Sequence, residues 1–208
     1  MGSSQNILAA RATRIAMSPT MKVAAEAMAL KAKGIDVVDL GAGEPDFPTP
    51  KHIGAAAHAA IDANFTKYTT NSGTDELKRA IVARYKADYG VEYATNEVIV
   101  SAGGKQALFN AVMVLFGAGD EVITHMPGWP TLVEQIKLAD ATPVIVHTHA
   151  EDGFRLRADT FVRAFTPKTR GIILASPGNP TGALISEEDL EVLATEAAKR
   201  GIWILLDL

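Results

Sequence analysis

Residues 172–182, which read IILASPGNPTG, pass from four apolar residues directly into a loop of prolines and glycines. The apolar part is too short for a helix and does not alternate with polar residues, so it predicts a strand buried on both faces. Ser186 and Asp189 then form a capping box for a helix that reaches Lys199. A second buried strand is predicted at residues 202–206. This order of strand, helix and strand indicates a parallel sheet.

The same alternation extends toward the N-terminus. Short apolar runs predict further strands at residues 98–100, 121–124 and 143–146, and helical spacing predicts helices at residues 105–116 and 129–139. Three helices precede them, at residues 18–33, at residues 51–64, and after a cap at Thr74. We therefore predict an α/β fold with a mainly parallel sheet sandwiched by helices.

The composition is that of a globular protein, and it argues against several classes of partner. The 208 residues are 48% hydrophobic and carry a net charge of −4, with both signs interspersed, so we expect no nucleic-acid or membrane partner. There is no cysteine, which is compatible with the cytoplasmic location that we expect. The five histidines lack metal-ligand spacing, so no metal site is predicted.

Three groups of candidate functional residues follow predicted strands, at the edge where α/β sheets bind ligands. Gly103 and Gly104 lead into a helix and favour an anion site, although an ordinary turn explains them equally well. Asn179 sits between prolines and can donate to an oxygen anion, or it can act as a turn former. Asp207 ends the last strand, where it either faces a cleft or is a solvated terminal acid.

Two aromatic residues are weaker candidates when taken alone. Trp129 follows a strand and can stack on a flat ring, but a core tryptophan is the simpler interpretation. Tyr68 by itself is an ordinary loop tyrosine.

In combination these residues give a stronger signal than any one of them alone. Over residues 15–207 the chain resembles fold-type I pyridoxal-phosphate (PLP) aminotransferases, close to the bacterial aspartate aminotransferases. The order and the spacing of the motifs both agree. The segments that carry the resemblance are LGAGEPDFPTP at 40–50, Tyr68 with Gly73 and Leu77, GGKQALFN at 103–110, GDEV at 119–122, PGW at 127–129 and SPGNPTGA at 176–183.

The resemblance implies a role for each candidate in holding the cofactor PLP. The backbone of Gly103, Gly104 and Lys105 would bind its phosphate. Trp129 would stack on the pyridine ring, and Asn179 would donate to the ring's 3′-oxygen. Asp207 would pair with the ring nitrogen and keep it protonated, so that the ring can withdraw electrons from the substrate.

The resemblance also implies substrates and an assembly. An amino acid, aspartate-like or from a broad set, and a 2-oxo acid would exchange an amino group, with Gly43 bordering the substrate beside Trp129 and Asn179. Tyr68 would reach the phosphate of a neighbouring subunit, which implies a homodimer with shared sites. Residues 1–45 would form an N-terminal arm and a small-domain segment, and residues 46–208 a partial PLP-binding large domain.

Two departures from the family pattern affect these expectations. Gly128 stands where the family has an aromatic residue, which would open the substrate side of the pocket. Asp207 is followed by Leu208 and the end of the sequence, whereas the family usually has Asp-Glu-(Ile/Val)-Tyr at this strand. We expect the chain to be part of a longer protein, with the Schiff-base lysine beyond Leu208. No catalytic residue is therefore assigned within the chain, and we expect it to be inactive alone.

Two other functions remain open at this stage. A PLP-dependent C–S lyase, or a decarboxylating relative, would use the same fold, because a fold does not fix a reaction. A non-catalytic regulator with an aminotransferase-like domain would need a DNA-binding domain in front, and residues 1–17 are too short for one.

Overall fold

The structure is a computed structural model that describes residues 8–16, 19–41 and 43–208. The chain divides into two compact units. The first, which we call the sheet unit, joins the N-terminal segment up to Pro19 to Gly104–Leu208. The second, which we call the helical unit, is Thr20–Gly103.

In the part of the sheet unit that the structure describes, four strands form one sheet and are all parallel. They are β1 (Glu121–Met126), β2 (Thr142–His147), β3 (Thr169–Ala175) and β4 (Trp203–Asp207), and their order across the sheet is β2-β1-β3-β4. The predicted strands at 121–124, 143–146, 172–175 and 202–206 are therefore confirmed, and the structure extends or shifts most of them by one to three residues. The predicted parallel α/β sheet is confirmed as well.

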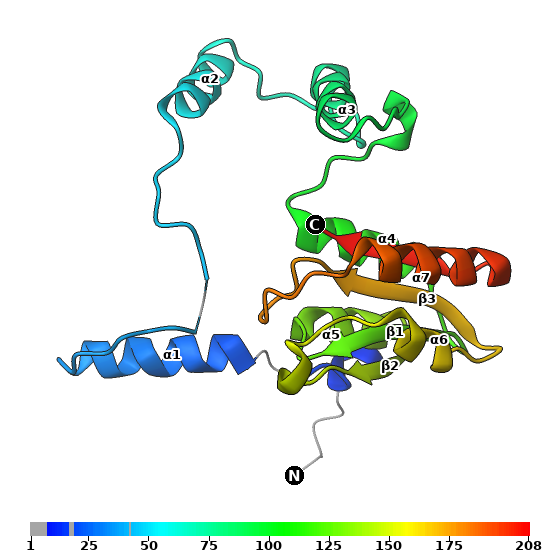
Figure 1. Cartoon of the computed structure of the whole chain (residues 1–208). Helices are drawn as coiled ribbons and strands as arrows, with labels where there is room; N and C mark the ends of the chain where they lie inside the picture. The colour runs from blue at the N-terminus through cyan, green and yellow to red at the C-terminus, as the bar shows by residue number, and fades with distance from the viewer. Residues whose placement is uncertain (1–7, 17–18, 42) are drawn as a thin grey trace. The chain divides into compact units, whose positions relative to one another are not determined.

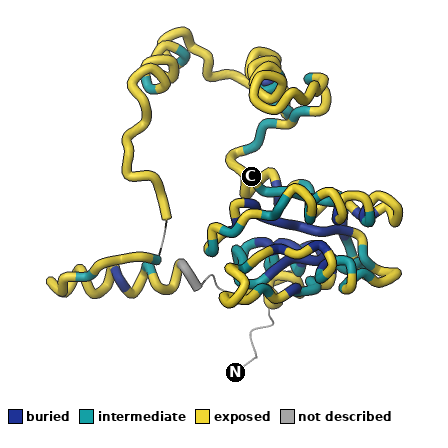
Figure 2. The backbone as a smooth tube through the Cα atoms, in the orientation of Figure 1, coloured by how far each residue is buried: buried dark blue, intermediate teal, exposed yellow. Residues whose placement is uncertain are grey.

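Helices cover both faces of this sheet (Figure 1). On one face α4 (Gly104–Leu115) and α5 (Pro130–Leu138) pack on inward residues such as Val122 and Ile173. On the other face α6 (Ala158–Arg163) and α7 (Glu187–Arg200) pack on their strand neighbours Ile123 and Ile172. Side chains alternate between the faces of a strand, so a run of apolar residues supplies both cores. Figure 2 shows this as buried strands between half-buried helices.

The start of α7 is a capping site that also ties two helices together. Ser186 Oγ accepts a hydrogen bond from the Asp189 N–H at 3.1 Å, as the predicted capping box requires. The Asp189 carboxylate accepts from the Ser186 hydroxyl at 2.6 Å and from the Ala158 N–H, the first residue of α6, at 3.0 Å. Arg155 donates to it as well, at 2.9 Å. The carboxylate therefore joins α7 to the start of α6.

Among its described residues, the helical unit has three α-helices and one short 3-10 helix, η2 (Thr95–Glu97). They are α1 (Pro19–Ala32), α2 (Lys51–Asp62) and α3 (Asp75–Tyr89), close to the predicted ranges. Thr74 caps α3 by accepting from the Leu77 N–H, as predicted, and Gly90 ends it in the left-handed region with φ 69°. Ser18, the predicted first residue of α1, lies outside the described residues.

One predicted strand is wrong. Residues 98–100 have no strand partner among the described residues, and Ile99 is 72% exposed. The Val100 N–H donates instead to the Ser72 carbonyl at 3.0 Å, within the helical unit. An apolar run becomes a strand only where another strand pairs with its backbone groups, and the sequence pattern does not report that partner.

Several short elements escaped prediction. These are η1 (Ala10–Thr13), η2, η3 (Ala150–Asp152) and α6. Arg14, just after η1, pairs with Asp140 at the end of α5, and this contact holds the N-terminal segment on the sheet unit. In the part of the chain that the structure describes, no helix has the length and apolar character needed to cross a membrane.

Candidate functional site

Three candidate residues lie at the same edge of the sheet. β1, β3 and β4 are consecutive neighbours and run parallel, so their carboxyl ends meet at one edge. Trp129 follows β1, Asn179 lies in the loop after β3, and Asp207 is the last residue of β4. Ala175, at the end of β3, is the register partner of Asp207. The topology thus gathers residues that are up to 78 positions apart in the sequence.

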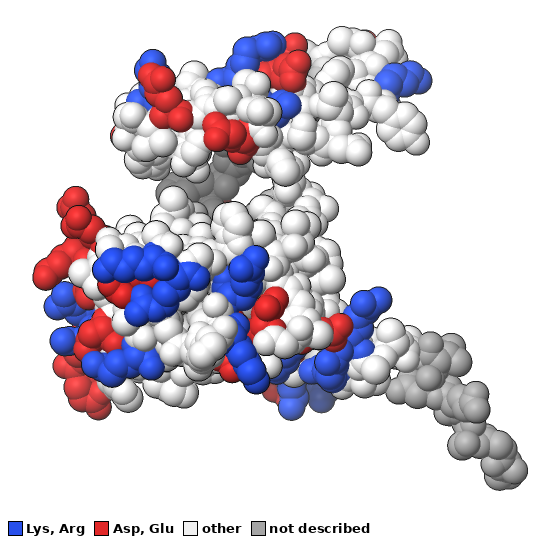
Figure 3. Space-filling view, turned by 90° about the vertical axis from the view of Figure 1, so that its right-hand side faces the viewer, with Lys and Arg blue, Asp and Glu red and all other residues white. Residues whose placement is uncertain are grey.

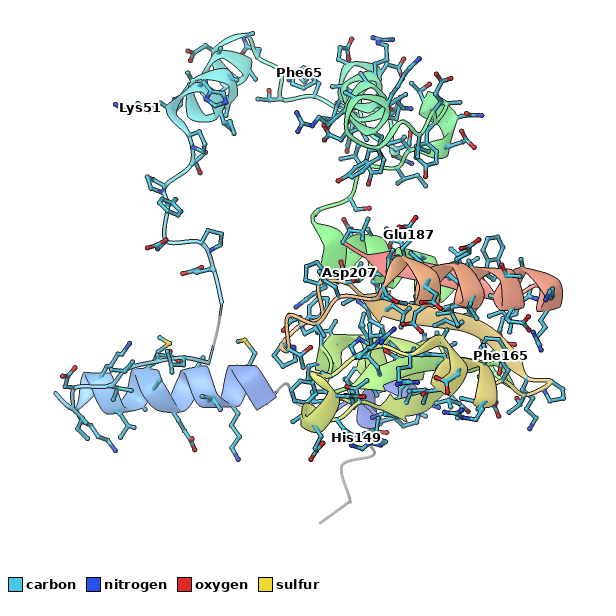
Figure 4. All side chains as sticks on the ribbon, in the orientation of Figure 1. Lys51, Phe65, His149, Phe165, Glu187 and Asp207 are labelled. Atoms are coloured by element: carbon cyan, nitrogen blue, oxygen red, sulfur yellow. The ribbon has the colours of Figure 1, made fainter. Side chains whose placement is uncertain are left out.

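Asp207, which is labelled in Figure 4, is the last residue of β4 and lies close to Gly104, the first residue of α4. A Cβ added to Gly104 would be 3.9 Å from Asp207 Oδ1. Both residues line a pocket of about 280 Å³, together with Leu108 and Leu205. The carboxylate has no hydrogen-bond or ion-pair partner among the described residues. A half-buried, unpaired carboxylate facing a pocket is available to a cationic or N–H-bearing ligand.

The loop before α4 brings backbone N–H groups to the same edge. Gly103 has φ 84°, a left-handed conformation that favours glycine, and α4 begins at the next residue. The first N–H groups of a helix have no partner within it, and the helix dipole adds partial positive charge there. The Gly103 N–H donates to the Ser101 carbonyl at 2.8 Å, so the N–H groups of Gly104 and Lys105 are the better placed for an anion.

Trp129 is the residue just before α5, and its ring is half-buried against the α4–α5 core. The Lys105 ammonium lies 5.1 Å from the centroid of this ring. A cation over an aromatic face at this distance is attracted by the ring's quadrupole. One side chain of the anion-binding turn is thus in direct contact with the candidate stacking residue.

The loop that carries Asn179 is closed by its own backbone. The Gly178 N–H donates to the Ala183 carbonyl at 2.8 Å, and the Gly182 N–H donates to the Gly178 carbonyl at 2.6 Å. Ser176 Oγ accepts from the Ile185 N–H at 3.1 Å, which anchors the loop's base. Asn179 is exposed at the tip of this loop. The fixed backbone favours a defined direction for its amide.

Gly128 has a structural reason to be glycine that the sequence pattern did not suggest. A Cβ added here would come within 2.3 Å of the His125 carbonyl oxygen. The His125 ring is buried, and its Nδ1 lies 3.0 Å from the Pro127 carbonyl. Burial lowers the pKa of this imidazole, and the bond to Pro127 opposes that shift only in part. The turn that presents Trp129 is therefore tightly packed against the end of β1.

The remaining candidates, Gly43, Tyr68 and Gly103, belong to the helical unit. Gly43 and Tyr68 are exposed, and nothing in that unit contacts the side chain of Tyr68 closely enough to bury it. Their proposed roles stay predictions. Ala42, within the same motif as Gly43, lies outside the described residues.

The residues that the sheet unit does bring together suit a ligand with an anionic group and a flat ring bearing a protonated nitrogen. The start of α4 offers N–H groups to the anion, Trp129 offers a ring face, and the unpaired Asp207 offers a carboxylate. One residue of this arrangement was missed from the sequence. Gln135, buried in α5, donates to the Lys105 carbonyl at 3.1 Å. Its signal was a polar residue on the apolar face of a helix.

A larger hollow lies elsewhere, at the end of β2, and has a volume of about 430 Å³. Three arginines line it, but Arg155 pairs with Asp189, and Arg157 and Arg163 both pair with Asp159. Figure 3, which views one face, likewise shows lysines and arginines intermixed with acidic residues. No group of three or more potential metal ligands occurs among the described residues. The smaller pocket of about 280 Å³ is lined by Gly104 at the start of α4 and by Asp207, whose carboxylate has no partner among the described residues.

Residues 35–208 match the family described as aminotransferase class I and II. The chain belongs to this family. Its members are PLP-dependent enzymes, so the cofactor suggested by the site is the family's own. The match covers the strands β1 to β4 and the helices α4 to α7 of the sheet unit.

Named relatives and solved structures agree with the family. The chain is 40% identical to the aspartate aminotransferase of Bacillus sp. (strain YM-2), over 98% of this chain and 52% of that protein. It is 42% identical to the aspartate/prephenate aminotransferase of Nitrosomonas europaea, over 92% and 48%. The aspartate aminotransferase from Thermus thermophilus with maleate superposes with a TM-score of 0.92 at 37% identity, over 99% of this chain and 53% of that one. The chain thus spans about half the length of the relatives it matches.

Proposed function

We propose that this chain is the cofactor-binding part of an aminotransferase that moves an amino group between an amino acid and a 2-oxo acid. The observation that carries the proposal is the meeting of Trp129, Asp207 and the start of α4 at one edge of the sheet. Several relatives at 40–43% identity are named aspartate or aspartate/prephenate aminotransferases, which supports an acidic or broad amino-acid substrate.

In this proposal each residue performs one physical task. The N–H groups of Gly104 and Lys105, together with the turn at Gly103, bind the phosphate of PLP. Trp129 covers one face of the ring and excludes water from it. The Asp207 carboxylate holds a proton on the ring nitrogen through a charge-assisted hydrogen bond. When bound, PLP supplies an electron sink for the carbon that loses its proton.

Asn179 and Gly43 complete the proposed site on the substrate side. The Asn179 amide, on its closed loop, donates to the 3′-oxygen of the cofactor. Gly43 lacks a side chain and leaves room for the substrate carboxylate. The lysine that forms the Schiff base is not assigned to any position in this chain, so we propose that residues 1–208 bind cofactor without turning over substrate.

The proposal includes a homodimer in which Tyr68 serves the neighbouring subunit. Its side chain is fully exposed in the structure, as expected for a residue whose partner lies in a second copy. In the complete protein, Tyr68→Phe should raise the dissociation constant for PLP by about 10- to 150-fold, since a hydrogen bond to a charged group contributes about 1.5–3 kcal/mol. Sedimentation should give a dimer. A fully active monomer would contradict this part of the proposal.

Two organisational parts of the proposal rest on the family likeness. We propose that residues 1–45 form an arm and a small-domain segment and that residues 46–208 form part of the large domain. This boundary differs from the division into sheet and helical units, which reflects packing within the chain alone. A cytoplasmic location is also part of the proposal.

Product analysis distinguishes an aminotransferase from a PLP-dependent lyase. The complete protein that carries this chain is incubated with aspartate and 2-oxoglutarate, and both products are measured. Equal amounts of a new amino acid and a new 2-oxo acid are expected. A second incubation replaces aspartate with a thioether amino acid such as cystathionine. Release of ammonia and a thiol there, with no amino-group transfer from aspartate in the first incubation, would favour a lyase and overturn the proposal.

A further inference from the structure

Gln135 is a buried polar residue of α5 that makes a hydrogen bond to the first turn of α4. Its side chain is only 6% exposed, among apolar residues such as Leu132 and Ile136 on the same helix. The Nε2 group donates to the Lys105 carbonyl at 3.1 Å, and Oε1 is buried without a partner among the described residues. A buried amide with one unpaired end destabilises the fold relative to an apolar residue of the same size. General packing therefore does not explain a glutamine here.

The bond that Gln135 makes is additional to the normal helical pattern. In an α-helix the carbonyl of residue 105 accepts from the N–H four residues further on. A carbonyl oxygen has two lone pairs, and the Gln135 amide uses the second. Only the NH₂ end of the amide can face a carbonyl, so the orientation of the amide follows from its partner.

The residue just before α5 contacts the side chain of Lys105. The ring centroid of this residue, Trp129, lies 5.1 Å from the Lys105 ammonium. Gln135, in the second turn of α5, holds the Lys105 carbonyl. Lys105 of α4 is therefore contacted twice, at its carbonyl by Gln135 and at its ammonium by Trp129.

This double contact sets the distance between two parts of the proposed site. The phosphate and the ring of the cofactor are covalently linked, so the N–H groups of α4 and the ring face of Trp129 have to be held in register. We propose that Gln135 is a positioning residue that keeps the phosphate-binding turn in register with Trp129. This inference rests on the proposed function, because it assigns a register to the PLP site.

The test compares a ligand that spans both parts with one that fills a single part. Pyridoxamine 5′-phosphate carries the ring and the phosphate but no aldehyde, so it cannot react with surface lysines. Inorganic phosphate occupies the anion site alone. Dissociation constants for both are measured by calorimetry on the complete protein that carries this chain, after its cofactor has been removed.

Gln135→Met keeps the volume of the side chain and removes the hydrogen bond. We expect it to raise the dissociation constant for pyridoxamine phosphate about 5–10-fold, since one hydrogen bond is lost. The dissociation constant for inorganic phosphate should change less than 2-fold. The midpoint of thermal unfolding should stay the same or rise, because the buried unpaired oxygen is also removed. A residue with a merely structural role would lower the midpoint and leave the ratio of the two affinities unchanged.

Glu134→Gln is the matched control. Glu134 is the neighbour of Gln135 on α5, but it contacts Lys137 and the Ala16 N–H rather than α4. Its substitution should leave both dissociation constants unchanged. If Gln135→Met lowers the unfolding midpoint, Gln135→Leu provides a second test, because it also lacks the donor and buries no charge. The affinity for pyridoxamine phosphate relative to that for inorganic phosphate should fall in the same way.

The outcomes separate this inference from the function on which it rests. Failure of the unsubstituted protein to bind pyridoxamine phosphate would overturn the proposed function. Normal binding that Gln135→Met leaves unchanged, or weakens equally for both ligands, would overturn the positioning role alone.

Discussion

The sheet unit and the helical unit contain elements that the sequence signals about equally well, yet they bury very different amounts of apolar surface. The sheet unit holds two buried clusters, one on each face of its strands. In the helical unit, Ala27 is the only described hydrophobic residue that is buried, while Met28, Ile61 and Phe65 are all more than 60% exposed (Figure 2). Helical periodicity therefore decides which segments become helices, whereas the stability of each unit depends on what covers them.

The largest expected effect contrasts two apolar residues on helices of the two units. Phe161 of α6 is completely buried, and Ile61 of α2 is 64% exposed. Phe161→Ala should lower the free energy of unfolding by about 3–5 kcal/mol, through lost transfer energy and a cavity. Ile61→Ala should change it by less than about 0.5 kcal/mol. Denaturant titration followed by circular dichroism measures both, and similar losses would show that Ile61 is buried in solution.

The second prediction concerns the site at the edge of the sheet unit. In the complete protein, Asp207→Ala should lower turnover roughly 100-fold or more, because a preorganised charge at the reacting group is lost. The control is Asp62→Ala, which removes an exposed carboxylate of α2 and should not affect turnover. Steady-state kinetics with aspartate and 2-oxoglutarate provide the measurement. Unchanged turnover in Asp207→Ala would refute the role proposed for that residue.

The sequence predicted most of the sheet unit because its signals are local. Apolar runs, the Ser186 cap and the loop around Asn179 each depend on residues close together in the chain. The strand at residues 98–100 was predicted wrongly because a strand also depends on a partner. The bond from Gln135 to Lys105 spans 30 positions, and no periodicity signals a contact of that kind.

A third prediction tests the contact between α6 and α7 on one face of the sheet. Hydrogen bonds from the Ser186 hydroxyl and then the Ala158 N–H, with a further contribution from Arg155, lower the pKa of Asp189 from 3.8 to about 2. Because the folded-state pKa lies below that of the unfolded chain, this stabilisation is complete above about pH 5 and is lost as the pH falls toward 2. Asp189→Ala should cost about 1–2 kcal/mol at pH 7, as other helix-cap losses do.

The control for Asp189 is a carboxylate with the same pKa and a different setting. Hydrogen bonds from Lys199 and Arg200 also lower the pKa of Glu196 to about 2, but this group is on the surface of α7. Exposed pairs of this kind contribute little. Glu196→Ala should therefore destabilise the protein much less than Asp189→Ala when unfolding is measured between pH 2 and pH 7. Equal losses of stability in the two variants would mean that the hydrogen bond between Asp189 and α6 contributes nothing to stability.

The smallest expected effects come from two glycine substitutions that test whether the helices of the helical unit are formed in solution. Gly54 lies within α2 and Gly90 ends α3, and a Cβ added at either position meets no atom within 4 Å. They differ in backbone conformation, because Gly90 has φ 69° and Gly54 is helical. Gly54→Ala should stabilise by up to about 1 kcal/mol through helix propensity. Gly90→Ala should destabilise α3 by about 1 kcal/mol, because the left-handed region disfavours a side chain.

Hydrogen exchange of the backbone amides in α2 and α3 measures the stability of each helix separately. Opposite shifts would show that these helices are formed in solution despite their exposed faces, whereas no change in either variant would show that they are not.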